Sequence, residues 1–379
     1  MNKNKLKLEK ICTFFNGRIK PNSKGKIPVY GGNGIISYTD QYNADNILVI
    51  GRVGAYCGNA FYSRNKCWVS DNAIGIILNE NVSNIKYIFY FLEKMNIRNL
   101  AIGSSQPLIT QDILKNIEID LPSLEEQKRI ADILTALDDK IELNNQMNQT
   151  LEEIASLLYK RWFVDFEFPD DKGNPYKSSG GEMVDSELGM IPKGWEVKEL
   201  GEFITLINGY AFKSGSYSKD GNYKIITIKN VLDNKFITNS TSKILEIPDN
   251  VRENQKLKIG DVLISLTGNV GRVCVVTEGE CLLNQRVAKI ISKIEENKYY
   301  WRTFFNTEEI KIKMINISKG TAQSNLSTIE IMKIKILNSK EVTYNFSEKI
   351  KAISKKKLQN EIMILNIEMI KQKLLEELV

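Results

Sequence analysis

The sequence predicts an α+β protein in which two similar domains, each with small mixed or antiparallel sheets and short helices, alternate with two long coiled-coil helices. A stretch that begins at Gly103 recurs in the same order from Gly320, at an offset of about 217 residues. Solenoid repeats have periods of only ~20–50 residues, so this offset marks two whole domains of one type. A long amphipathic stretch follows each copy.

Shorter matches extend the repeat, and they keep one common order in both copies. Two patterns typical of buried strands correspond when Ile47 is aligned with Val262, and glycines follow both of them. We therefore expect one domain at residues 1–122 and the other at residues 191–340. The matching stretches are 47–50 with 262–265, 86–89 with 298–301, and 103–106 with 320–323.

A helix start ends the first domain, because Ser123 and Glu126 have the spacing of a capping box. Beyond it, apolar residues recur at alternating spacings of three and four, which predicts a coiled-coil helix at residues 123–165. The expected pairing positions are Ile130, Leu134, Leu137, Ile141, Asn144, Asn148, Leu151 and Leu158.

Two of these pairing positions are asparagines, Asn144 and Asn148. An apolar interface leaves an amide unpaired unless a partner side chain meets it, and a buried asparagine in such an interface is known to fix helix register. Alternatively, both asparagines face solvent where the helices diverge. The sequence leaves these two possibilities open.

The chain between the first helix and the second domain, residues 166–190, is rich in Gly, Ser and Pro and has the composition of a linker. A second long helix is expected at residues 341–379. It carries a basic run at 355–357, for which a solvated face is a simpler explanation than a phosphate clamp. Its expected pairing positions are Ile353, Ile362, Leu365 and Met369.

Composition excludes several classes of protein. The 379 residues include no histidine, so the commonest general base and the usual catalytic triads are missing. Five cysteines without a Cys-x-x-Cys spacing indicate structural thiols and no metal site. There is no long apolar run or signal peptide, so we expect a cytoplasmic protein without membrane contact. The net charge of +6 suits a polyanionic partner but does not identify one.

Four stretches carry a resemblance to the specificity subunits of type I restriction-modification systems. They are PVYGGNG at 28–34, LPSLEEQKRI at 121–130, WFVDF at 162–166 and GMIPKGW at 189–195. The resemblance spans essentially the whole chain. The chain departs from the family where KEVT at 340–343 replaces the Pro-x-x-Glu-Gln opening of the first helix.

The resemblance implies a non-catalytic scaffold that binds double-stranded DNA. In this family two target-recognition domains each read one half of a split, asymmetric site. Two antiparallel helices between them dock two methyltransferase subunits, and restriction (motor-nuclease) subunits join the complex for cleavage. S-adenosylmethionine, Mg and ATP are then cofactors of the partner subunits, and this chain needs none.

The DNA-reading residues are expected on loops that a sheet positions. Gln106 and Gln323 could each make a bidentate contact with adenine, although a glutamine that caps a strand or turn explains them too. Arg52 and Arg272 follow the two predicted strands, where they read guanine, clamp phosphate or form surface salt bridges. The DNA-binding candidates are Asn33, Arg52, Asn72, Ser104, Ser105, Gln106, Thr267, Asn269, Arg272, Gln285, Arg286, Lys319, Thr321 and Gln323.

Two other functions remain as alternatives. A self-sufficient DNA-modifying enzyme would methylate or cleave DNA as a purified chain, and the missing catalytic motifs argue against it. A coiled-coil scaffold without DNA contact would show no salt-dependent DNA binding even with its partners present.

Helix length is expected to set the spacing of the two half-sites. One helical turn inserted after Asn144 lengthens the helix by ~6 Å, which is close to two base pairs at ~3.4 Å each. The recognised site should therefore gain about two base pairs between its halves, which mapping of methylated bases would detect. An unchanged spacer would contradict this role of the helix.

Overall fold

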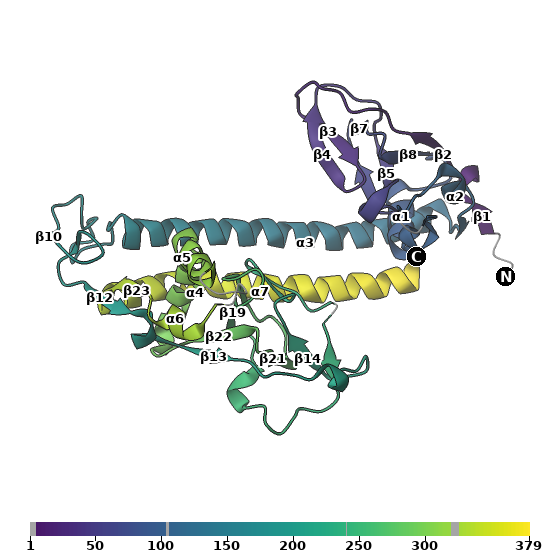
Figure 1. The fold of residues 1–379 in the computed structure, drawn as a ribbon. Helices are drawn as coiled ribbons and strands as arrows, with labels where there is room; N and C mark the ends of the chain where they lie inside the picture. The colour runs from purple at the N-terminus through teal and green to yellow at the C-terminus, as the bar shows by residue number, and fades with distance from the viewer. Residues whose placement is uncertain (1–4, 104–105, 240, 320–325) are drawn as a thin grey trace. The chain divides into compact units, whose positions relative to one another are not determined.

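The fold is described by a computed structural model that covers residues 5–103, 106–239, 241–319 and 326–379 (Figure 1). Two long helices are present, α3 (Leu124–Tyr159), which continues as one π-helical stretch at Lys160–Val164, and α7 (Lys340–Leu378). The chain forms two compact units. Residues 1–142 and 365–379 make unit 1, and residues 143–364 make unit 2. Each long helix is thus shared between the two units, whereas the sequence predicted domains and helices as separate segments of the chain.

Unit 1 contains the first domain, whose main sheet has the strand order β2-β8-β5-β6 with all pairs antiparallel (Figure 1). A second sheet has the order β4-β3-β7, and β1 pairs with β9. The strands are β1 (Lys5–Lys7), β2 (Cys12–Asn16), β3 (Ile27–Gly31), β4 (Gly34–Thr39), β5 (Ile47–Gly51), β6 (Ala60–Ser63), β7 (Trp68–Val69), β8 (Ala73–Leu78) and β9 (Glu118–Asp120), and the short helices are α1 (Ile85–Met95) and α2 (Gln111–Lys115).

Unit 2 contains the second domain, whose main sheet has the order β13-β22-β19-β20, again antiparallel. A second sheet has the order β17-β14-β21-β18. The strands are β10 (Met183–Val184), β11 (Ile191–Pro192), β12 (Glu196–Glu199), β13 (Ile204–Asn208), β14 (Tyr223–Ile226), β15 (Val231–Leu232), β16 (Lys235–Phe236), β17 (Lys243–Ile244), β18 (Lys256–Leu257), β19 (Val262–Ser265), β20 (Val273–Val275), β21 (Cys281–Leu283), β22 (Val287–Ser292) and β23 (Lys335–Asn338), and the short helices are α4 (Lys298–Asn306), α5 (Glu308–Lys319) and α6 (Thr328–Met332).

The two main sheets confirm the duplication and correct its alignment by one residue. In unit 1, Leu48 of β5 pairs with Ile76 of β8. In unit 2, the corresponding pair is Val262 of β19 with Ile290 of β22. Leu48, and not Ile47, is therefore the counterpart of Val262. The sequence aligned two short runs of mainly aliphatic residues, which match almost equally well when shifted by one position.

Each unit buries part of both long helices in its own core. In unit 1, Ile130 and Leu134 of α3 join the same apolar cluster as Leu375 of α7. In unit 2, Phe346 of α7 packs edge-on against Phe163 at the end of the first helix, with ring centroids 5.2 Å apart. Further along unit 2, Asn148 contacts Asn360, so the helices run antiparallel there, as the resemblance implied.

Residues 166–190 are packed more closely than a linker composition predicts. Phe166 and Phe168 are buried, and their rings lie 5.6 and 5.4 Å from the ring of Trp195. Tyr176 stacks on Phe168 at 4.7 Å. The Gly and Ser residues of this segment form turns, while its aromatic residues attach it to the core of the second domain. Its aromatic content was the signal against a free linker.

The five cysteines are buried and free, as expected for structural thiols. Burial raises the pKa of the Cys12 and Cys281 thiols to about 12, which keeps them protonated and unreactive. Among the described residues, no helix is long and apolar enough to cross a membrane.

Gly51 at the end of β5 provides a test of the first domain. A Cβ at this position would lie 2.5 Å from the carbonyl oxygen of Gly32 and 2.6 Å from that of Tyr56. Because both contacts are with backbone, Gly51→Ala should lower the free energy of unfolding by about 1–3 kcal/mol in urea denaturation. Gly279→Ala is the control, since a Cβ there meets no atom within 4 Å. Equal stability of the two variants would refute the close backbone approach.

Candidate nucleic-acid interface and helix pair

Three loops of the first domain meet beside the end of β5. The Arg52 amide donates to the Asn72 carbonyl at 2.9 Å, and the Ile109 amide donates to the Arg52 carbonyl at 2.9 Å. The Gly54 amide bonds the carbonyl of Pro107, the residue after Gln106, at 3.1 Å. Backbone pairing thus brings together three of the predicted DNA-reading positions that are far apart in the sequence.

The side chains at this meeting point are available to a ligand. Asn33, Asn72 and Gln106 are exposed, and Arg52 is half-buried. The Arg52 Nε is buried and makes no hydrogen bond with the described part of the chain. No carboxylate of that part forms an ion pair with Arg52 either, so the salt-bridge alternative has no support there.

The second domain repeats the same backbone pattern. The Leu266 amide donates to the Arg286 carbonyl at 3.0 Å, and the Leu326 amide donates to the Leu266 carbonyl at 2.8 Å. These loops surround an open hollow of about 530 Å³. Thr267, Gln285 and Arg286, all predicted from the sequence, contribute to its lining, and the last two are exposed.

Arg272 and Asn269 have a structural role within their loop. Arg272 lies 3.8 Å from the Asp233 carboxylate, and the Asn269 amide oxygen accepts from Arg272 Nη1 and Nη2 at 3.1 Å when its amide is oriented to do so. The Arg272 amide bonds the Ser265 hydroxyl at 3.0 Å. Of the three explanations for Arg272, the structure supports the surface salt bridge, because Asp233 lies within reach of its guanidinium group.

The repeated stretches at 103–106 and 320–323 contain five of the DNA-binding candidates, namely Ser104, Ser105, Gln106, Thr321 and Gln323. Ser104, Ser105, Thr321 and Gln323 lie outside the described residues, as does the side chain of Lys319 at the end of α5.

Several polar residues near these loops did not stand out in the sequence. Asn208, Ser327 and Thr328 line the hollow of the second domain. In the first domain, the exposed residues of the loop at 17–26 include four basic and no acidic side chains, and Ser23 ties this loop to Thr39 at 2.8 Å. A search for charge runs in loops would have found the basic loop. The hollow depends on which loops meet, and the sequence gives no signal for that.

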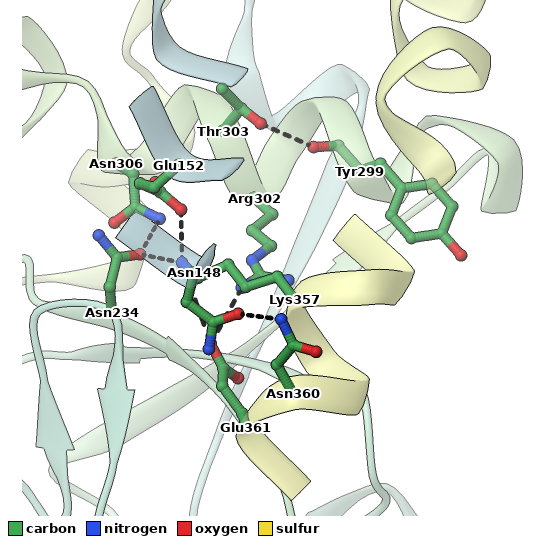
Figure 2. Close-up of polar contacts among 10 residues, drawn as sticks. All are labelled: Asn148, Glu152, Asn234, Tyr299, Arg302, Thr303, Asn306, Lys357, Asn360 and Glu361. Atoms are coloured by element: carbon green, nitrogen blue, oxygen red, sulfur yellow. Dashed lines mark hydrogen bonds and ion pairs between the residues drawn. The ribbon is translucent and has the colours of Figure 1, made fainter. Parts of the chain in front are cut away.

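The two asparagines of the first helix are buried, which excludes the solvent-facing alternative. Asn144 is 2% exposed and Asn148 is 9% exposed. The Asn360 Nδ2 on α7 donates to the Asn148 Oδ1 at 3.0 Å (Figure 2). A partner amide thus meets Asn148 across the helix pair, as the register-fixing interpretation requires. The buried Asn144 Nδ2 has no hydrogen-bond partner among the described residues, so the contact supports this interpretation for Asn148 alone.

The pairing face of α7 differs from the predicted one. Asn360, Ile367 and Leu375 are buried, whereas Met369 is 64% exposed. The assignment of Met369 to the helix pair is therefore wrong, and its assignment to the docking of a partner stays a prediction. The sequence followed apolar residues, but the buried face includes polar positions. On the two helices Ile130 and Leu134 are buried, and the half-buried pairing positions are Leu137, Ile141, Leu151, Leu158, Ile353, Ile362 and Leu365.

Lys357 also contradicts a prediction, because the basic run at 355–357 is not a wholly solvated face. The Lys357 side chain is 6% exposed and forms an ion pair with Glu152 of α3 (Figure 2). Its Nζ lies 3.9 Å from Glu361. Burial lowers the pKa of Lys357 and raises the pKa of Glu361. Because lysine is not apolar, the periodic spacing of apolar residues could not reveal that Lys357 lies inside the helix pair.

Fold and site together define a class of protein, a duplicated α+β scaffold with corresponding polar loops on its two domains. Each domain presents exposed donor and acceptor side chains at corresponding loop ends, and these side chains differ between the domains. Parts of two long antiparallel helices complete each unit.

The family model of the type I restriction modification DNA specificity domain matches residues 2–153 and 192–362. The chain belongs to this family. It is 29% identical over 307 residues to the type I restriction enzyme HindI specificity subunit of Haemophilus influenzae, covering 68% of this chain and 67% of that protein. It is 27% identical over 321 residues to the MjaVIII specificity subunit of Methanocaldococcus jannaschii, covering 82% of this chain and 72% of that one.

A solved structure has a similar fold. The type I restriction-modification S subunit from M. genitalium aligns with a TM-score of 0.62 at 16% identity, over 100% of this chain and 96% of the other. At this identity the likeness supports the fold class alone.

The Asn148–Asn360 contact can be tested by a double-mutant cycle. Asn148→Leu leaves the buried Asn360 Nδ2 without its acceptor and should lower the free energy of unfolding by about 1–3 kcal/mol. Replacing both residues by leucine should recover most of this loss, because the Asn360 amide that lost its acceptor is then removed as well. Urea denaturation measures both effects, with Asn145→Leu at an exposed neighbouring position as control. Strictly additive losses would contradict the contact.

Proposed function

We propose that this chain is the DNA specificity subunit of a type I restriction-modification complex and reads a split, asymmetric DNA site with one domain per half-site. The observation that carries the proposal is the repeated meeting of loops at the ends of β5 and β19, with different side chains at equivalent places. Arg52 and Asn72 occupy one set of loops, and Thr267, Gln285 and Arg286 occupy the other. Different side chains on one backbone pattern are what two unlike half-sites need.

Base reading requires exposed groups that both donate and accept hydrogen bonds. Asn33, Asn72 and Gln285 provide both, and Arg52 and Arg286 suit a bidentate contact with guanine. The basic loop at 17–26 and the net charge of +6 favour contacts with phosphates. Sequence-specific binding of double-stranded DNA is therefore the function that these loops support best.

In this proposal the chain is not an enzyme. Its partners are two methyltransferase subunits, with restriction subunits in the full complex, and the cofactors S-adenosylmethionine, Mg and ATP belong to those partners. We place the complex in the cytoplasm, where its DNA substrate is. The family membership and the exposed DNA-reading side chains support this division of roles.

The proposal is tested by co-expressing the chain with its methyltransferase in a host without DNA methylation and mapping the modified bases. Modification of a split motif that depends on this chain is expected, beside a methyltransferase-only control. A stable complex that leaves DNA unmodified would favour the coiled-coil scaffold. Modification by the purified chain alone would establish the self-sufficient enzyme.

A substitution in one domain should change the recognition of only one half of the motif. Arg52→Ala should relax the bases accepted in one half of the motif, and Arg286→Ala should relax the other half, because each lost bidentate contact removes about 1–3 kcal/mol of discrimination. Arg129→Ala, which removes an exposed arginine paired with Glu126 on α3, should leave the motif unchanged. Relaxation of both halves by either substitution would contradict one domain per half-site.

A further inference from the structure

The polar network around Lys357 connects four separate parts of unit 2 (Figure 2). Lys357 lies on α7 and pairs with Glu152 on α3. It also donates to Asn234 in the turn between β15 and β16, at 3.4 Å. Glu361, one turn further along α7, lies 3.7 Å from Arg302 on α4. The network thus joins both long helices to two elements of the second domain.

The charged side chains on α7 and α4 in this network are largely buried. The side chains of Lys357, Arg302 and Glu361 are 6%, 10% and 17% exposed. The lowered pKa of Lys357 and the raised pKa of Glu361 both favour the neutral form, and burial is the first cause of each. Apolar residues of similar size often replace such a network without loss of stability, so buried charges at these positions are not required for a stable core.

The network does distinguish one register of the helices from others. Asn148 faces Asn360, and Glu152 faces Lys357. A slip of one heptad along α7 would place Asn148 opposite Ile353 and Glu152 opposite Ile350, which leaves a buried amide and a partly buried carboxylate without partners. The aromatic contacts of Phe163 with Phe346 and Tyr300 oppose the same slip, and the network adds to them the penalty of polar groups without partners.

We infer that the buried polar network around Lys357 is a positioning device. It fixes one register of α3 against α7 and one position of the second domain on this helix pair. It thereby fixes one spacing between the two half-sites. The statement about spacing rests on the proposed function. A slip of one heptad displaces a helix by ~10 Å, equivalent to about three base pairs. Glu152, Arg302, Lys357 and Glu361 act as positioning residues without touching DNA.

The test replaces the four charges by apolar residues of similar length, in the variant Glu152→Leu/Arg302→Met/Lys357→Met/Glu361→Leu. Its thermal unfolding midpoint should be unchanged or higher. With the methyltransferase present, the share of modified sites with an altered spacer should rise on the order of tenfold, the factor that ~1.4 kcal/mol of lost discrimination gives. The matched control is Glu348→Leu/Lys351→Met, which removes an exposed ion pair on α7 and should keep the single spacer.

A second readout reports register without DNA. Asn148→Cys with Asn360→Cys should crosslink in both the wild-type and the four-residue backgrounds. Asn148→Cys with Ile353→Cys should crosslink only in the four-residue background, where the slipped register becomes accessible. This readout separates the inference from the proposed function, because it does not require the chain to direct any methylation.

The outcomes are distinct. A folded four-residue variant with one spacer and no slipped crosslink would overturn the inference. If that variant does not fold, the smaller variant Glu152→Gln/Lys357→Met is tested, which keeps the Arg302–Glu361 pair. If the smaller variant does not fold either, the network is needed for stability, and this result would also overturn the inference. A wild-type chain that directs no modification contradicts the proposed function, and the crosslinks then still decide whether the network fixes the register.

Discussion

The pairing of α3 with α7 is the contact on which the other features depend, because each domain completes its core with residues from both helices. Ile130 and Leu375 belong to the core of unit 1, while Phe163 and Phe346 belong to the core of unit 2. Neither domain core is complete without parts of both helices. The buried Asn148–Asn360 and Glu152–Lys357 contacts make this pairing specific, at a cost in desolvation that apolar residues would avoid.

One backbone used twice explains how a single chain can read two different sequences. The carbonyls of Arg52 and Leu266 accept equivalent hydrogen bonds, so the loops around them are supported in the same way. The side chains on those loops need not match, because the sheets and not the loops carry the fold. Recognition can therefore differ between domains while the architecture stays fixed.

The sequence predicted the duplication, the two long helices and several loop residues that the structure brings together, because strand runs, heptads and capping residues are local signals. It did not predict Lys357 inside the helix pair, and it placed Met369 there wrongly, because periodicity counts apolar residues and cannot find a buried charge with a distant partner. The packing of Phe166 and Phe168 on Trp195 was missed because the Gly, Ser and Pro residues of this segment were given more weight than its aromatic side chains. The meeting of Arg52 with Asn72 depends on strand order, which no single segment encodes.

Site-specific photo-crosslinking tests most directly whether each domain reads its own half of the DNA. A photoreactive phenylalanine derivative would replace Asn72 in one chain and Gln285 in another, both exposed, with Lys349 on α7 as control. In the complex with methyltransferase and DNA carrying the modified motif, the Asn72 position should crosslink to one half-site and the Gln285 position to the other. Crosslinks from both positions to the same half, or to no DNA at all, would contradict the account.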